Sequence, residues 1–182
     1  MGFIPGYMAH YSVNGCRIIA VMIFRTKIIF LFIMLLTATS SVFGLEQNPF
    51  AIPAYSTEYS PSRDPFIDGK NALLYAEQTN RKVLIEIGGD WCQWCHILDQ
   101  FINDHPIVKQ ALYDHFVLLK VNVSEENKNK KFMSSLPEVD GYPHVYITDT
   151  KGSIKFSGDL SPLLEKGKFS EKYFLEFFDK WK

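Results

Sequence analysis

Hydrophobic and polar residues follow two different periods along residues 68–182, and together these periods predict both strands and helices. Largely apolar runs predict buried strands at residues 83–87 and 116–123. Two further segments, 144–148 and 153–157, flank the turn Thr150-Lys151-Gly152 and predict the two strands of a hairpin. Apolar spacing, capping residues and charge order predict helices over residues 68–80, 94–102, 106–115, 124–135 and 170–181.

Capping and charge patterns fix the starts of three of these helices. Asn103-Asp104 supplies a capping signal ahead of the helix at 106–115, and Ser170 caps the last helix. The helix predicted to open at Ser124 carries acidic residues early and lysines late, as the helix dipole prefers. The resulting order is helix, strand, helix, strand, helix, hairpin, helix. It predicts an α/β fold in which helices flank both faces of a central mixed β-sheet.

Residues 1–44 differ in composition from the rest of the chain, because they contain three basic residues and no Asp or Glu. From Met22 onward, two basic residues, the apolar run 28–36 and small residues up to Gly44 are typical of a secretory signal peptide. We therefore expect cleavage before Leu45. Residues 1–44 are accordingly interpreted as an N-terminal extension followed by a cleaved signal peptide.

The alternative interpretation of this segment is a membrane anchor. The run 28–36 has nine residues, whereas about 20 are needed to span a bilayer. Extending the run backwards brings Arg25 and Lys27 into its middle. A cleaved signal is the preferred prediction, which leaves no stable membrane anchor on the mature protein.

The remaining chain divides into two parts. Residues 45–63 are rich in Pro, Ser and Tyr without a clear period, which predicts an extended arm or linker that could pack through Tyr55 and Tyr59. Residues 64–182 form the main domain, and a chain with 47% hydrophobic and 21% charged residues suits one globular domain. Residues 1–44 hold three of the 19 basic and none of the 20 acidic residues, so the mature chain has a formal charge of −4. Nothing in that balance points to nucleic acid.

Two cysteines lie at a predicted strand-to-helix junction. Cys92 and Cys95 follow the strand at 83–87 and the turn Gly88-Gly89. A thiol at a helix N-terminus faces unpaired backbone N–H groups and the positive end of the helix dipole, and both favour the nucleophilic thiolate. Because Cys16 leaves with the signal peptide, this pair makes up all the cysteine of the mature chain. A disulfide closing so short a loop constrains little of the unfolded chain, so the pair is predicted to serve chemistry rather than stability.

Three separate features of residues 64–182 resemble the thioredoxin fold. The first is Asp90-Trp91-Cys92-Gln93-Trp94-Cys95, which is similar to a segment of secreted thioredoxin-like proteins. The second is Gly141-Tyr142-Pro143, directly before a predicted strand. The third is Glu86, six residues before Cys92, where thioredoxins usually place a buried Asp. The resemblance implies a thioredoxin fold with a redox-active disulfide between Cys92 and Cys95.

The resemblance also implies a role for each of these residues. Cys92 would attack a substrate disulfide, and Cys95, one helical turn further in, would resolve the mixed disulfide. Glu86 would be buried, so that its pKa rises and it exchanges a proton with Cys95. The alternative for Glu86 is a solvent-facing carboxylate on an edge strand.

Five residues are the implied contacts of a substrate. Pro143 would be a cis-proline facing the dithiol, and with Tyr142 it would pair with the substrate backbone. Trp91 would shield the sulfur atoms and contact unfolded substrate, with Gln93 beside it. Trp94 could belong to the same apolar rim around the sulfur atoms, or it could be an ordinary core residue, and the sequence favours neither.

The residues around the cysteines bear on the redox poise. Gln93-Trp94 replaces the Gly-Pro of thioredoxins and the histidine-containing pairs of oxidising relatives. His96 is a candidate for redox tuning, because a protonated imidazole would stabilise a thiolate; a solvent-facing position is its alternative. His144 is also expected near the sulfur atoms.

Other kinds of function stay open. Cys92, Cys95, His96 and His144 could supply thiolate and imidazole ligands to copper or zinc. A dithiol oxidase, or a binding or chaperone module that only uses the fold, are further alternatives. Each of them would use the fold without the disulfide-reducing chemistry that the resemblance favours.

The sequence thus predicts an exported thiol–disulfide oxidoreductase that reduces or isomerises protein disulfides. It would act on disulfide-containing proteins, need an unidentified redox partner that recycles the dithiol, and use neither a cofactor nor a metal. Residues 178–182 carry no ER-retention signal, so a bacterial periplasm or secretion is the expected location.

Overall fold

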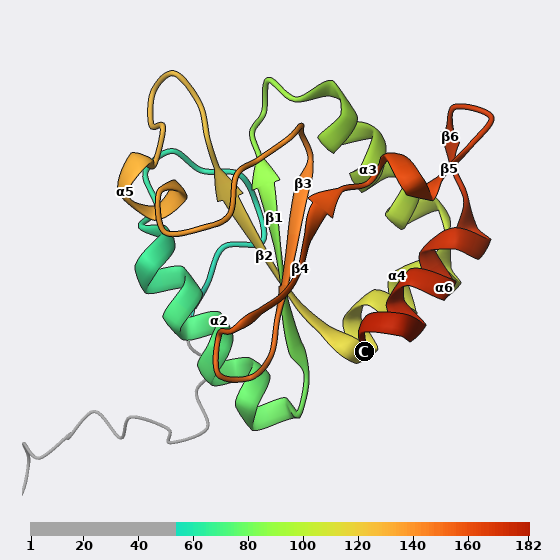
Figure 1. The fold of residues 1–182 in the computed structure, drawn as a ribbon, viewed down its shortest axis with the longest axis horizontal. Coiled ribbons are helices and arrows are strands. Elements are labelled where there is room, and N and C mark those ends of the chain that lie inside the picture. The colour runs from blue at the N-terminus through green and yellow to red at the C-terminus, as the bar shows by residue number, and fades with distance from the viewer. Residues whose placement is uncertain (1–53) are drawn as a thin grey trace, which may run out of the picture. The chain divides into compact units, whose positions relative to one another are not determined.

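A central four-stranded sheet with helices on each face is the architecture of residues 54–182, the part of the chain that the computed structural model describes (Figure 1). The predicted extension and signal peptide, residues 1–44, lie outside the described residues. The helices are α2 (Pro65–Thr79), α3 (Gln93–Asp104), α4 (Pro106–His115), α5 (Lys130–Met133) and α6 (Glu171–Trp181). The strands are β1 (Lys82–Gly88), β2 (Phe116–Asn122), β3 (His144–Thr148), β4 (Ile154–Asp159), β5 (Leu164–Glu165) and β6 (Lys168–Phe169). A short 3-10 helix, η2 (Ser161–Leu163), precedes β5.

Strand β1 lies inside the main sheet, whose strand order is β2-β1-β3-β4. It pairs parallel with β2, with Glu86 opposite Lys120, and antiparallel with β3, with Glu86 opposite Val145. The alternative that Glu86 sits on an edge strand is therefore wrong. Strands β5 and β6 form a separate two-stranded hairpin.

Each face of the sheet buries its own hydrophobic core. Ile85 and Ile87 pack with α2 residues on one face, where α5 also contributes Phe132. Leu84 packs on the other face with residues of α3, α4 and α6. Figure 1 shows this division, with α2 and α5 on one side of the sheet and α3, α4 and α6 on the other. The predicted α/β class, a mixed sheet with helices on both faces, is confirmed.

The predicted helix over residues 124–135 is wrong, since only the four residues of α5 are helical there. Polar side chains bind the backbone of this segment in its place. The Ser124 hydroxyl accepts from the backbone N–H of Asn127 at 3.3 Å, and the Asn129 amide donates to the carbonyl of Asn122 at 2.6 Å. Asn129 also adopts a left-handed backbone conformation, with φ of 43°. Such local bonds compete with a helix, and the charge order along the segment does not reveal them.

Element boundaries differ from the prediction at three further places. Helix α2 begins three residues earlier than predicted, because the Asp64 carboxylate caps it by accepting the Phe66 N–H at 2.8 Å. Asn103-Asp104 ends α3 and does not cap α4, whose N-cap is His105. Ser170 is the N-cap residue of α6, but its side chain makes no capping hydrogen bond.

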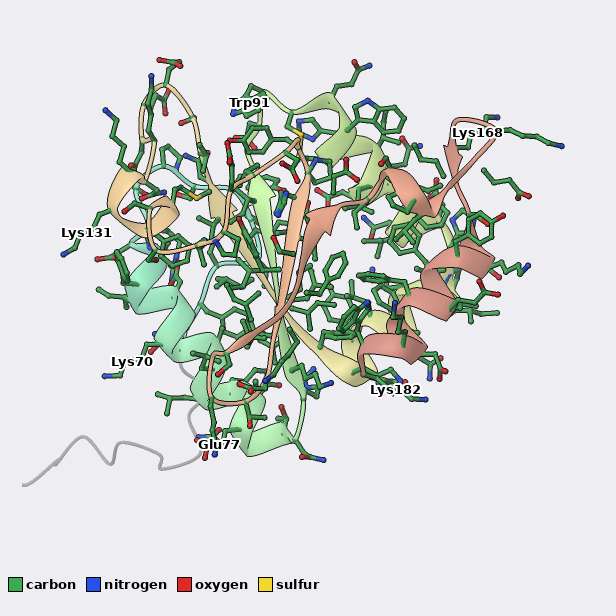
Figure 2. The ribbon with its side chains drawn as sticks, viewed as in Figure 1. Lys70, Glu77, Trp91, Lys131, Lys168 and Lys182 are labelled. Carbon is green, nitrogen blue, oxygen red and sulfur yellow. A yellow bond between two sulfur atoms is a disulfide. The ribbon has the colours of Figure 1, made fainter. Side chains whose placement is uncertain are left out.

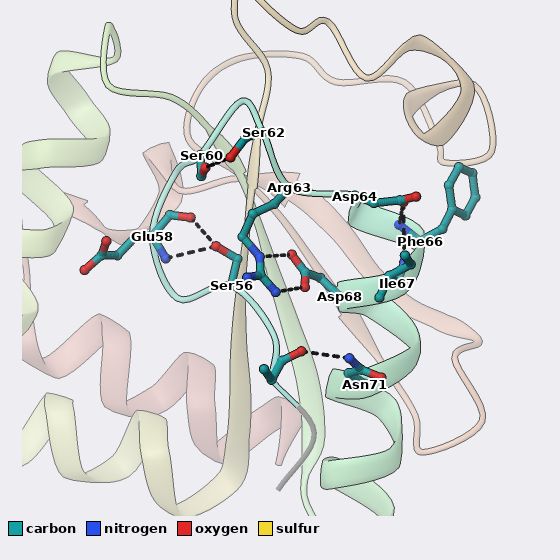
Figure 3. Close-up of polar contacts among 11 residues, drawn as sticks. Ser56, Glu58, Ser60, Ser62, Arg63, Asp64, Phe66, Ile67, Asp68 and Asn71 are labelled. Carbon is teal, nitrogen blue, oxygen red and sulfur yellow. Dashed lines mark hydrogen bonds and ion pairs between the residues drawn. The ribbon is translucent and has the colours of Figure 1, made fainter.

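Residues 54–63 pack along the domain, which agrees with an arm rather than a free linker. The Ser56 carbonyl accepts the backbone N–H of Lys120 at 3.0 Å, at the edge of β2. The guanidinium of Arg63 pairs with the buried carboxylate of Asp68, and the Asn71 amide donates to the carbonyl of Ala54 at 2.7 Å (Figure 3). The arm therefore covers the exposed edge of the sheet next to α2. None of the helices between residues 54 and 182 combines the length and apolar composition of a membrane span.

Candidate active site

A disulfide joins Cys92 and Cys95 at the start of α3. Cys92 is the N-cap residue of this helix, and its Sγ accepts the backbone N–H of Cys95 at 3.2 Å. The predicted placement of a sulfur atom against the helix N-terminus is therefore present. Cys92 is 3% exposed and Cys95 is fully buried, so neither cysteine offers much surface to solvent.

Two glycines, the last residue of β1 and the one after it, allow close packing around the disulfide. A Cβ atom added to Gly88 would lie 2.6 Å from both Cys95 Sγ and the hydroxyl oxygen of Tyr59. A Cβ atom added to Gly89 would lie 2.6 Å from the indole Nε1 of Trp91. These distances leave no space for a side chain at either position.

An aromatic pair forms one border of the disulfide. Trp91 and Tyr142 meet edge to face with their ring centroids 5.1 Å apart, and Tyr142 also packs against the cluster of Tyr59, Cys92 and Cys95. The Trp91 Nε1–H donates to the carbonyl of Val123 at 2.7 Å, yet the side chain stays 56% exposed (Figure 2). The Tyr142–Pro143 peptide bond is cis. Trp91 and Tyr142 thus combine fixed orientation with free apolar surface beside the sulfur atoms.

Trp94 borders the disulfide on another side. It is 42% exposed and meets Phe169 of the β5–β6 hairpin at a centroid distance of 5.8 Å. Of the two interpretations left open for Trp94, the rim position agrees with this exposure. Gln93 is exposed between the two cysteines. The β5–β6 hairpin, which supports Trp94, was not predicted from the sequence, because each strand has only two residues.

Glu86 lies on β1, two residues before Gly88, and is buried at 1% exposure. Burial disfavours the charged carboxylate and raises the pKa of Glu86 from 4.5 to about 7, although Lys120 and Tyr59 act in the opposite direction. Lys120 Nζ lies 3.9 Å from one carboxylate oxygen, and the Tyr59 hydroxyl donates to the other at 2.5 Å. The carboxyl group can therefore take up and release a proton near neutral pH.

Tyr59 and Lys120 are the site residues that sequence reasoning missed. The Lys120 ammonium is 6% exposed, lies 4.8 Å from the centre of the Tyr59 ring, and also forms an ion pair with Asp99 of α3. Lys120 interrupts the apolar run of β2, and a charge inside a predicted buried strand is the signal that could have indicated a partner for Glu86. Tyr59 carries no comparable signal, because its arm lacks a period that would place it.

The two candidate histidines, His96 and His144, have separate contacts. His96 is exposed, and its Nε2 lies 2.8 Å from the carbonyl oxygen of Asp90. His144 is fully buried, with its Nε2 3.0 Å from the Ser157 hydroxyl and its ring 4.7 Å from that of Tyr146. Burial lowers the pKa of His144, so the neutral form is favoured.

The alternative metal site required cysteine and histidine side chains to converge. Among residues 54–182, no group of three or more His, Cys, Asp or Glu side chains is arranged to hold a metal ion. The disulfide also occupies both sulfur atoms in this state. The described part of the chain therefore gives the metal alternative no support.

The sheet order, the dithiol at the junction of β1 and α3, and the facing Tyr142–Pro143 loop define a thioredoxin-like domain. Residues 67–150 match the protein family described as "Thioredoxin-like". The described part of the chain therefore has a thioredoxin-like fold, as predicted, and its residues 67–150 are similar to that family.

Curated and solved proteins agree with this fold. The chain is 28% identical over 122 residues to the thiol:disulfide interchange protein DsbD of Citrobacter koseri, a match that covers 66% of this chain and 21% of that protein. Among solved structures, it resembles a disulphide isomerase from Xylella fastidiosa Temecula1, with a TM-score of 0.57 and 23% identity over 70% of this chain and 98% of that one. It also resembles the oxidised C-terminal domain of DsbD from Neisseria meningitidis, with a TM-score of 0.50 and 16% identity over 65% and 97% of the two chains.

The matched region is short relative to the curated proteins. The chain spans less than a quarter of the length of the curated relatives it matches. The relatives therefore support the fold, and the activity has to be argued from the site.

Proposed function

We propose that this protein is an exported thiol–disulfide oxidoreductase that reduces or isomerises disulfides of other proteins. The observation that carries the proposal is the Cys92–Cys95 disulfide at the N-terminus of α3, with the buried carboxyl group of Glu86 linked to it through Tyr59. The names of its relatives, a thiol:disulfide interchange protein and a disulphide isomerase, support the same class of reaction.

The reaction begins from the reduced dithiol. The Cys92 thiolate, stabilised by the helix N-terminus, attacks one sulfur of a substrate disulfide, and the other substrate sulfur leaves as a thiolate. Cys95 then loses its proton and attacks Cys92 Sγ. The Cys92–Cys95 bond forms, the bond from Cys92 to the substrate breaks, and the second substrate thiolate leaves. The substrate disulfide gains two electrons and two protons, and the dithiol loses them.

The surroundings of Cys92 suit a protein substrate. Cys92 itself is 3% exposed. A substrate sulfur that reaches it therefore brings the neighbouring substrate residues against the side chains around Cys92. Trp91 and Trp94 offer exposed indole surface there, and we propose both, with Gln93, Tyr142 and Pro143, as the substrate contacts. Indole rings provide large contact area at a small entropic cost.

A cysteine-trapping experiment with the full chain tests this proposal. In a Cys16→Ser background, so that no third thiol reacts, reduced protein is mixed with insulin and the loss of insulin disulfides is measured. Cys92→Ser should abolish the reaction, and Cys95→Ser should accumulate a mixed disulfide that is visible on a non-reducing gel. Wild-type protein that leaves insulin oxidised would show that the dithiol does not perform this exchange.

The direction of electron flow needs a second measurement. Gln93-Trp94 offers no strongly oxidising feature between the cysteines, which favours reduction or isomerisation. A reductase must be recycled, so the proposal includes a redox partner that donates electrons to the Cys92–Cys95 disulfide. Equilibration with a glutathione buffer gives the reduction potential, and a value near −120 mV, typical of a strong dithiol oxidant, would contradict the reductase direction.

Export rests on residues 22–44. The basic residues, apolar run and small residues of this segment support a signal peptide cleaved before Leu45. N-terminal sequencing of protein recovered from outside the cytoplasm tests this, and a mature chain that retains residues 22–44 would contradict it.

A further inference from the structure

Tyr59 contacts both the carboxyl group of Glu86 and the cysteine pair. Its hydroxyl group donates to Glu86 Oε1 at 2.5 Å. The Tyr59 hydroxyl oxygen and Cys95 Sγ both lie 2.6 Å from the position that a Cβ atom on Gly88 would take. The two atoms therefore border one small space. Tyr59, Cys92 and Cys95 form a buried contact cluster of their own.

Tyr59 comes from a different segment of the chain than the residues it contacts. Tyr59 belongs to the arm ahead of α2, while Glu86 and Cys95 belong to β1 and α3. The arm is held at the edge of β2 by the bond from Lys120 N–H to the Ser56 carbonyl, at 3.0 Å. Its Tyr59 is 9% exposed, and its ring contacts the Lys120 ammonium. The arm thus brings one phenol into contact with both the carboxyl group and the cysteine pair.

We propose that the Tyr59 hydroxyl carries the proton between Cys95 and Glu86 when the mixed disulfide is resolved. This inference rests on the proposed function and assigns to that reaction a residue outside the dithiol helix. The Cys95 thiol gives its proton to the Tyr59 oxygen, while Tyr59 gives its own proton to Glu86. Tyr59 remains neutral throughout, Glu86 becomes protonated, and the Cys95 thiolate attacks Cys92 Sγ. Protonated Glu86 returns the proton through the same phenol or to solvent after the substrate leaves.

A concerted transfer fits the electrostatics of Tyr59. Burial, followed by the nearby Glu86 carboxylate, raises the pKa of the phenol, so a free phenolate is disfavoured. A neutral hydroxyl that passes one proton on as it accepts another avoids that charge. The other charged or titratable groups around Tyr59 and Glu86 are Lys120, Asp99, Asp90, His96, Tyr113 and Glu58.

The test separates the two chemical steps on one sample. Reduced full-length protein in the Cys16→Ser background reacts with dithiobis(nitrobenzoate) in a stopped-flow instrument. Attack by Cys92 releases the first thionitrobenzoate, and resolution by Cys95 releases the second. We expect Tyr59→Phe to leave the first release unchanged and to slow the second about 100-fold at neutral pH, the lower range of what a positioned proton carrier contributes.

The pH dependence and a double variant distinguish proton transfer from packing. The rate of the second release should follow the titration of Glu86 in the wild type and lose that dependence in Tyr59→Phe. Glu86→Gln should show the same loss, and the double variant should be no slower than Glu86→Gln alone, because the two residues act in one path. Tyr55→Phe is the matched control: Tyr55 lies on the same arm but packs against Tyr75, and both releases should keep the wild-type rates.

Two results would overturn the inference while leaving the proposed function intact. One is a Tyr59→Phe variant whose second release keeps the wild-type rate and pH profile. The other result applies if the variant does not fold: a wild-type second release that is equally fast in H₂O and D₂O would show that proton transfer does not limit that step, whereas the inference makes the transfer through Tyr59 rate-limiting. A wild-type protein without any second release would instead contradict the proposed exchange itself.

Discussion

The buried carboxyl group of Glu86 should make the protein less stable as the pH rises through neutrality. As the pH rises, this group loses its proton and becomes charged inside the folded protein. Burial raises the pKa of Glu86 to about 7, whereas the side chain has a value near 4.5 when exposed. Between these two values the folded protein holds a proton that the unfolded chain has released, so raising the pH favours the unfolded chain.

The size of the effect follows from the two pKa values. Each pKa unit of difference is worth about 1.4 kcal/mol, so the interval from 4.5 to about 7 corresponds to about 3 kcal/mol. This stabilisation is fully present below pH 4.5 and is lost as the pH rises through 7. It is a large part of the roughly 5–15 kcal/mol that separates folded from unfolded domains.

Urea unfolding of the oxidised protein measures this effect. The free energy of unfolding is determined between pH 4.5 and 8.5 for the wild type and for Glu86→Gln, in which the amide cannot titrate. The difference between the two proteins isolates Glu86 from all other titrating groups. It should change by about 3 kcal/mol across the range, with the wild type losing more stability at high pH. Glu126→Gln, an exposed substitution in the loop before α5, serves as the control and should follow the wild type.

Parallel curves for the wild type and Glu86→Gln would refute the reasoning. They would mean that the pKa of Glu86 is the same in the folded and unfolded chain, so that the ion pair with Lys120 compensates fully for burial. A difference of the opposite sign would show that the carboxylate is charged throughout and stabilised by Lys120 and Tyr59.

Three substitutions test other parts of the structure. Gly88→Ala should cost about 1–3 kcal/mol in urea unfolding, because its Cβ would lie 2.6 Å from Cys95 Sγ and the Tyr59 hydroxyl; an equally stable variant would contradict that packing. Asp64→Ala should cost about 1 kcal/mol by removing the cap of α2, whereas Asp64→Asn should retain most of the stability. Asn129→Ala should lower the free energy of unfolding by about 2 kcal/mol, because it loses both a hydrogen bond and a residue suited to φ of 43°, and Asn129→Gly should recover part of the loss. For Asn129, indistinguishable melting curves of the Ala and Gly variants would show that the left-handed backbone is not a constraint.

Residues with a strong period or a family motif could be placed from the sequence. The strand at 144–148 and the helix at 106–115 have the predicted bounds. The strand is buried throughout, and the helix buries one face through Val108 and Leu112. An apolar run and a helical spacing therefore each report the structure directly.

The features that could not be predicted depend on single polar contacts between distant segments. The loop at 124–129 is held by Asn and Ser side chains, which look the same in a sequence whether or not they bind the backbone. The ion pair between Lys120 and Asp99 joins β2 to α3 across 21 positions of the chain. No local period encodes such a pair, and only the register of β1 against β2 brings Lys120 opposite Glu86.

The contacts of the arm, residues 54–63, bear on where the domain begins. The sequence places the domain start at residue 64, shortly before the regular periods begin at residue 68. In the structure, however, Tyr59 satisfies one oxygen of a carboxyl group that is 1% exposed, and Ser56 satisfies a backbone N–H at the edge of β2. A chain that began at residue 64 would leave both groups without these partners, and an unsatisfied buried polar group costs about 1–3 kcal/mol. Since the carboxyl group stands next to the disulfide, the same loss would open the site to water and remove the phenol beside Cys95. The functional unit therefore includes the arm from at least Ser56 onward, although nothing periodic in those residues indicates it.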